Sequence, residues 1–170
     1  MGCLRTRGPE SPILLLVFKK MVEKQRIEAL VEEFINGTSM FPVAVKVSST
    51  NRITVLVDKN EGITIDECAS LHKYIEKNLD REIEDFELQV SSPGLDLPFL
   101  VFEQYIKNEG EKVEITDNDG SKYTGKLKNV TKGGFELETE IKIKGETKEI
   151  KDISFNFDQI KATRVILTIK

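Results

Sequence analysis

Apolar residues recur three and four positions apart between residues 22 and 36, with charged residues between them. This spacing lines one face of a helix, so a first amphipathic helix is predicted here. Its apolar positions are Ile27, Leu30, Val31, Phe34 and Ile35. Gly37 follows and predicts the end of the helix, because glycine readily adopts the left-handed conformation of a helix C-terminus.

The next apolar residues alternate with a period of two, over 41–47 and again over 53–57. Two strands joined as a hairpin through the polar loop 48–51 are therefore predicted. A second helix is predicted to begin near Thr64, because Thr64 and Glu67 have the spacing of a capping box. A third strand follows over 86–90. The order α-β-β-α-β predicts a two-layer α+β domain, in which both helices cover one face of a three-stranded sheet.

The second part of the chain has a different texture, with short strands separated by polar turns. A short amphipathic segment over 100–108 comes first, and five strands are then predicted. They are placed at 113–115, 123–130, 135–141, 150–155 and 165–169, with one 3₁₀ turn at 157–160. Gly125 lies inside the second strand, where glycine often marks a bend. Five short antiparallel strands with a bent second strand predict a small SH3-like or Sm-like β-barrel.

A segment of small and turn-forming residues separates the two parts. It consists of Ser91, Ser92, Pro93, Gly94, Leu95 and Asp96. Pro93 and Gly94 suit the central pair of a type II turn. The simplest interpretation is a turn between two domains, and the alternative is a surface positioned for a partner. The predicted organisation is an α+β domain over 21–92, a linker over 93–100 and the barrel over 101–170.

Residues 1–20 differ from the rest and are expected to be a non-native or disordered extension. Their apolar run at 13–18 is far below the roughly 20 residues that span a bilayer. Gly2, Cys3 and Thr6 fit a myristoylation pattern, so a lipid anchor is the alternative. We expect no membrane association and a cytoplasmic protein, since two cysteines make no disulfide framework.

Composition and charge narrow the classes of function. The chain has 170 residues, of which 39% are hydrophobic and 32% charged, as in globular proteins. A net charge of −4 argues against nucleic-acid binding through a uniformly positive surface. Cys3, Cys68 and His72 are the only cysteines and histidine, fewer than the four ligands of a structural zinc site. No structural zinc site is therefore predicted, and Cys68 with His72 is interpreted as a neighbouring pair on a helix face rather than a catalytic dyad.

One basic group stands out in the second part. Lys122, Lys126, Lys128 and Lys132 occur with no acidic residue between them. Such lysines commonly protect edge strands and keep a protein soluble. The functional alternative is that they contact phosphates of RNA.

The central segment and its flanks resemble the ribosome maturation factor RimP family. Residues 86–96 are similar to the central signature of that family, and the resemblance runs from about Met21 to the C-terminus. Asp58 with Gly62-Ile63-Thr64, and the segment 157–162, support it. Where the family often has an arginine before a proline, this chain has Leu97. The first twenty residues have no counterpart.

The resemblance implies a monomeric, non-enzymatic, cofactor-free factor that binds the free small ribosomal subunit and helps it to mature. Its expected partners are ribosomal RNA and a basic ribosomal protein. Four acidic residues near the third strand are candidate contacts to that protein. They are Glu82, Glu84, Asp85 and Glu87. The alternative function is an Sm-like module that binds RNA outside the ribosome.

Overall fold

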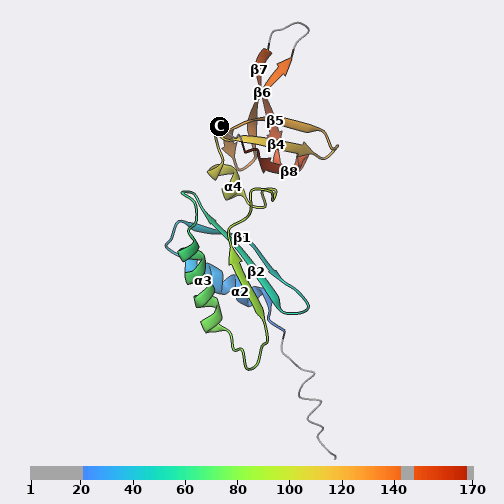
Figure 1. Ribbon diagram of the computed structural model, residues 1–170. Helices are drawn as coiled ribbons and strands as arrows, with labels where there is room; N and C mark the ends of the chain where they lie inside the picture. The colour runs from blue at the N-terminus through green and yellow to red at the C-terminus, as the bar shows by residue number, and fades with distance from the viewer. Residues whose placement is uncertain (1–20, 143–147, 168–170) are drawn as a thin grey trace, which may run out of the picture.

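Two β-sheets lie one above the other along the length of the molecule (Figure 1). The computed structural model describes residues 21–142 and 148–167. The predictions for residues 1–20 lie outside these residues, as does the turn predicted at 144–146. The architecture is α+β, with the first sheet mixed and the second antiparallel.

The first half has the predicted order of elements. They are α2 (Lys24–Ile35), β1 (Met40–Val47), β2 (Arg52–Lys59), α3 (Ile65–Asn78) and β3 (Glu87–Ser91). Strand β2 is central: it pairs antiparallel with β1, through the predicted hairpin, and parallel with β3. The parallel pairing is possible because the helical crossover through α3 returns the chain in the same direction.

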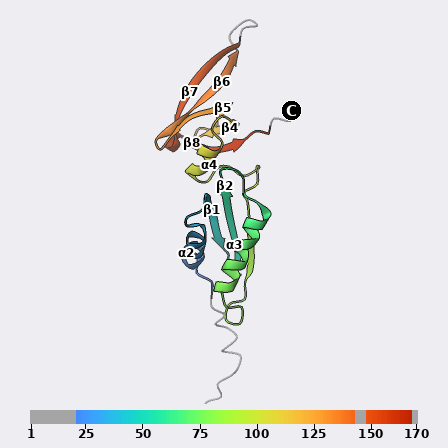
Figure 2. The same cartoon turned by 90° about the vertical axis from the view of Figure 1, so that its left-hand side faces the viewer.

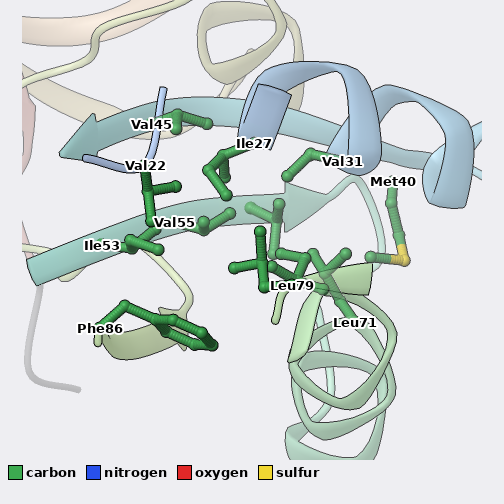
Figure 3. Packing of buried hydrophobic residues seen from close by; sticks show 12 residues of the cluster. Val22, Ile27, Val31, Met40, Val45, Ile53, Val55, Leu71, Leu79 and Phe86 are labelled. Atoms are coloured by element: carbon green, nitrogen blue, oxygen red, sulfur yellow. The ribbon is translucent and has the colours of Figure 1, made fainter. Parts of the chain in front are cut away.

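A single hydrophobic core joins α2 and α3 to this sheet (Figure 3). Ile27 and Val31 of α2 and Leu71 of α3 pack in it with Ile53 and Val55 of β2, and all five side chains are fully buried. These are the positions that the helical and strand periodicities selected. Figure 2 shows α2 and α3 beside the strands of this sheet from a second direction.

The capping box at the start of α3 is confirmed. The Thr64 hydroxyl accepts a hydrogen bond from the backbone N–H of Glu67 (3.2 Å), and the Glu67 carboxylate accepts one from the Thr64 N–H (2.8 Å). Glu67 also pairs with Lys59 of β2 at 3.1 Å. Hydrogen bonding to Thr64 and Lys59 lowers the pKa of the Glu67 carboxyl. The helix start is thereby tied to the sheet as well as capped.

The second half begins with the short helix α4 (Phe102–Lys107). Its strands are β4 (Lys112–Asp117), β5 (Lys122–Thr131), β6 (Gly134–Lys142), β7 (Lys148–Asn156) and β8 (Ile160–Val165), with the 3₁₀ turn η1 (Phe157–Gln159) before β8. A tight turn follows β4, in which the Gly120 N–H donates to the carbonyl of Asp117 (3.1 Å) and Gly120 has φ 87°. The predicted 3₁₀ turn is also confirmed.

The five strands do not close into the predicted barrel. Their order is β7-β6-β5-β4-β8, and among the described residues no ladder joins the outer strands β7 and β8. The first strand, β4, pairs antiparallel with both β5 and the last strand, β8. A core of aromatic and aliphatic residues, including Tyr105 and Phe135, fills its inner face.

The position predicted for the last strand was wrong. Strand β8 begins at Ile160 rather than Val165, and Leu167 is 64% exposed. The error arises from Thr163, which pairs opposite Ile115 and is fully buried despite being polar. Its Oγ1 accepts a hydrogen bond from the Tyr105 hydroxyl (3.0 Å), which satisfies it in the core. Because this core position is occupied by a polar residue, the alternation of apolar residues did not indicate a strand there.

Gly125 lies at a close approach of strands rather than at the bulge. A Cβ atom added there would lie 2.3 Å from the carbonyl oxygen of Glu138 on β6. The irregularity in the pairing of β5 with β6 comes later, between Lys128 and Thr131, where Asn129 has φ 48°. Glycine at position 125 is therefore required by interstrand packing.

Candidate functional site

The central segment makes a turn two residues later than predicted. The backbone N–H of Leu97 donates to the carbonyl of Gly94 (3.1 Å), so Leu95 and Asp96 are the central pair. Gly94 is not among the glycines with positive φ in the described chain, whereas a type II turn centred on Pro93 and Gly94 requires it. The predicted turn type is therefore wrong.

The side chains of this segment are largely available at the surface. Ser92, Leu95 and Asp96 are exposed, and Ser91 and Pro93 are half-buried. Within the described residues, the side chains of Ser91, Ser92 and Asp96 make no hydrogen bond. Ser91 ends β3 opposite Leu56 of β2, so the segment starts at the edge of the first sheet.

An ion pair joins the two halves beside this segment. Lys107 Nζ, at the end of α4, donates to both Asp58 Oδ1 (2.7 Å) and Asp58 Oδ2 (2.8 Å) at the end of β2. The Asp58 side chain is 9% exposed and that of Lys107 is 24% exposed. Asp58 Oδ1 also accepts from the backbone N–H of Lys59 (2.8 Å). The carboxylate is thus held from both sides of the joint.

An apolar contact supplements the ion pair. Phe41, Val43 and Leu56 form a small buried cluster, separate from the core under the helices, and Val101 from the start of α4 packs on it. A cleft of about 270 Å³ lies at the central segment, and its lining includes Pro93, Gly94, Asp58 and Lys107. The central segment is therefore part of an interface between the two halves.

Two of the four lysines predicted as candidate RNA contacts are engaged in ion pairs. Lys122 pairs with Glu114 (3.0 Å), and Lys128 pairs with Glu138, which raises the pKa of the Lys128 ammonium. Lys126 and Lys132 are exposed. The candidate RNA-contacting group is thereby reduced to two lysines without an ion pair among the described residues.

The four acidic residues do not form one surface. Glu84 is 2% exposed and accepts two hydrogen bonds from Arg26 Nη1 of α2 (3.0 and 3.1 Å), so it is unavailable to a partner. Glu82, Asp85 and Glu87 are exposed, and Glu87 pairs with Arg52 at 2.9 Å.

Cys68 and His72 do not assemble a catalytic dyad. The His72 ring places Nε2 at 3.2 Å from the carbonyl oxygen of Leu88 and Nδ1 at 3.9 Å from Glu76. Burial, with the carboxylates of Glu67 and Asp58, raises the pKa of the Cys68 thiol, which disfavours the reactive thiolate.

Sequence reasoning missed a group of aromatic residues on the second half. Phe99, Phe102, Tyr105 and Phe157 line a groove of about 480 Å³ together with Lys132, and we call it the aromatic groove. The rings of Phe102 and Phe157 lie edge to face, with centroids 6.0 Å apart. The residues are spread over nearly sixty positions, so no local pattern brings them together.

The described part of the chain shows neither a membrane-spanning helix nor a cluster of metal ligands. No helix in it is long and apolar enough to cross a membrane. No three histidine, cysteine or acidic side chains within it are grouped so that they could hold a metal ion.

Comparison with known proteins places the chain in a family. A family model described as the RimP N-terminal domain matches residues 27–96. A protein named ribosome maturation factor RimP from Porphyromonas gingivalis is 34% identical over 126 residues, which cover 74% of this chain and 83% of the relative. A protein of the same name from Christiangramia forsetii is 38% identical over 98 residues, which cover 56% of this chain and 64% of the relative. Another from Cytophaga hutchinsonii is 31% identical over 134 residues, which cover 72% of this chain and 80% of the relative. The chain therefore belongs to the ribosome maturation factor RimP family.

Proposed function

We propose that this protein is a non-enzymatic assembly factor that binds the free small ribosomal subunit and promotes its maturation. The observation that carries the proposal is the joint between the halves, in which Lys107 grips Asp58 and Val101 packs on the first sheet. It holds two different surfaces in one arrangement, as a factor that engages RNA and a ribosomal protein together requires. Bivalent engagement of this kind adds about 10²–10⁴ in avidity to weak contacts. Membership of a family named for ribosome maturation supports the same conclusion.

The proposed protein consists of two domains joined by a linker. We assign 21–92 to an α+β domain, 93–100 to a linker and 101–170 to an SH3-like or Sm-like domain whose barrel is open between β7 and β8. The pairing of the last strand with the first and the 3₁₀ turn before it support the second assignment. Phe99 packs with the core of the second domain, which favours a short linker.

The surfaces are assigned by their charge. On the second domain, Lys126 and Lys132 are the proposed RNA contacts. On the first domain, Glu82, Asp85 and Glu87 are the proposed contacts to a basic ribosomal protein, because opposite charges steer such encounters. The protein is proposed to act as a monomer in the cytoplasm.

Sedimentation with purified ribosomal particles tests the function. The protein is expected to migrate with free small subunits and their precursors, and not with large subunits. Absence from both small-subunit fractions would contradict the proposal.

Binding to RNA outside the ribosome is the alternative. Charge reversal at Lys126 and Lys128 would then abolish binding to RNA generally. The Lys128–Glu138 pair weakens this alternative, because one of the two lysines is already neutralised.

A further inference from the structure

The aromatic groove is the surface of the second half that combines ring faces with a cation. Phe99, Phe102 and Phe157 are half-buried and contribute to its lining, and Tyr105 forms its base with 8% exposure. Lys132 is exposed at its edge and makes no ion pair with the described residues. No acidic side chain of the described chain lines the groove.

Three backbone N–H groups of the lining are already used. Phe99 N–H donates to the carbonyl of Thr163 (2.8 Å), and the N–H groups of Leu100 and Val101 both donate to Gln104 Oε1 (2.7 and 3.3 Å). These three groups therefore cannot pair with the backbone carbonyls of a peptide lying in the groove. The groups of the groove that can contact a ligand are therefore the aromatic rings and the ammonium group of Lys132.

An unpaired nucleotide matches that offer. A base stacks on an aromatic ring with its face while its polar edge stays in water, and a phosphate attracts an ammonium group. A volume of about 480 Å³ is within the range of small-ligand sites and accommodates one base with its sugar. The rings of Phe102 and Phe157, which both line the groove, are close to perpendicular, with an interplanar angle of 87°.

We propose that the aromatic groove binds one unpaired nucleotide of RNA, with the base against Phe102 and Phe157 and the phosphate at Lys132. The inference deepens the proposed function, since it rests on RNA of the small subunit being the natural ligand. It also predicts binding to short single strands in the absence of ribosomal particles, which is measured separately.

The test compares two labelled strands of about eight nucleotides, within the size range of single-strand sites, by fluorescence anisotropy of the full chain. One is oligouridine and the other is an abasic strand of the same length. Oligouridine is expected to bind about 5- to 100-fold more tightly, the range that stacking of one base supplies. Equal binding of the two strands would overturn the proposal.

Two variants locate the effect. Phe102→Leu keeps an apolar side chain without the flat ring, and is expected to remove the preference for oligouridine while leaving abasic binding unchanged. Phe34→Leu is its control, because Phe34 is also a half-buried ring in an aromatic pair, with Tyr74, but belongs to α2. Lys132→Ala is expected to weaken the binding of both strands. It should also lower the slope of log affinity against log salt concentration by about 0.7. Lys122→Ala removes a lysine that is already paired with Glu114. It is expected to leave the affinities for both strands and the salt slope unchanged.

The outcomes separate this inference from the proposed function. If the unchanged protein sediments with small subunits but does not prefer oligouridine, the groove inference fails and the proposed function stands. If Phe102→Leu and Lys132→Ala then also weaken sedimentation with subunits, a protein segment occupies the groove, and the RNA assignment is wrong.

Discussion

Lys107 and Asp58 connect the two halves of the molecule through two hydrogen bonds of 2.7 and 2.8 Å to one carboxylate. Interfaces between domains of one chain commonly permit relative motion unless they are large and apolar. Here the apolar contact is small, consisting of Val101 on the cluster of Phe41, Val43 and Leu56. The ion pair is thus the main directional constraint on the angle between the halves.

Removing this constraint is expected to loosen the joint without unfolding either half. Lys107→Met eliminates hydrogen bonds to a charged group, each worth about 1.5–3 kcal/mol in favourable cases. Small-angle X-ray scattering should show a larger radius of gyration and a broader distribution of distances, while circular dichroism stays unchanged.

Lys122→Met is the matched control for the joint. It breaks the Lys122–Glu114 pair, which lies within the second sheet, so its scattering curve should equal that of the unchanged protein. A compact Lys107→Met variant would show that the apolar contact alone sets the angle.

The ion pair between Arg26 and the buried carboxylate of Glu84 is expected to contribute measurably to stability. Arg26→Met leaves the Glu84 carboxylate, 3% exposed, without its cation, and breaking buried pairs costs about 3–5 kcal/mol. Because Arg26 itself is 42% exposed, we expect a loss near the lower end of that range, about 3 kcal/mol, in urea denaturation.

An exposed pair provides the comparison for Arg26. Arg52→Met breaks the pair with Glu87, whose side chains are 65% and 68% exposed, and should cost less than about 1 kcal/mol. Equal losses for the two variants would mean that Glu84 reaches water in solution.

Local patterns predicted the elements because the physical causes were local. Two local signals served here: the four-residue spacing of Ile27 and Val31 on one helix face, and the three-residue spacing of Thr64 and Glu67 at a helix start. The hairpin loop between β1 and β2 is equally short-range.

The features that the sequence did not reveal depend on distant partners. Lys107 meets Asp58 from 49 positions away, and Arg26 buries Glu84 from 58 positions away. From the sequence alone, Thr163 is expected at the surface because it is polar. It is buried because its hydroxyl accepts a hydrogen bond from Tyr105. Phe102 and Phe157 join one groove only because α4 and η1 meet on the second half.

The close approach at Gly125 predicts a strong effect of a single methyl group. In Gly125→Ala, the Cβ would lie 2.3 Å from the Glu138 carbonyl oxygen and 2.8 Å from Leu137 Cγ, so β5 and β6 must separate. Overpacking of this kind costs about 1–3 kcal/mol, measurable as a lower midpoint of thermal unfolding.

Gly133→Ala is the control for this substitution, since nothing lies within 4 Å of its Cβ position. It should change the free energy of unfolding by no more than about 0.5 kcal/mol. A neutral Gly125→Ala variant would contradict the strand packing described here.

The cap on α3 predicts a dependence of stability on pH. The pKa of Glu67 is lowered in the folded protein, so its contribution is present above the ordinary glutamate pKa and is lost as the pH falls through the folded value. Glu67→Gln should therefore lower the denaturation midpoint at pH 7, and the difference from the unchanged protein should shrink as the pH falls below 4.5.

A neighbouring glutamate provides the control substitution. Glu61 is exposed, and its side chain makes no hydrogen bond or ion pair with the described residues, so Glu61→Gln should leave the denaturation midpoint at pH 7 unchanged. A constant difference for Glu67→Gln across the pH range would mean that protonation of Glu67 does not change the stability of the folded protein.

Leu97 tests whether the central segment contacts RNA or only positions the two halves. Its side chain is 43% exposed and lines the cleft beside Lys107, so Leu97→Arg should change stability by no more than about 0.5 kcal/mol. If the segment acts by holding the joint, affinity for free small subunits should also stay within about twofold. Ile83→Arg, a substitution of a residue 56% exposed in the loop before β3, controls for the added charge. Tighter binding by Leu97→Arg alone, with a salt slope steeper by about one, would instead place a phosphate at the cleft.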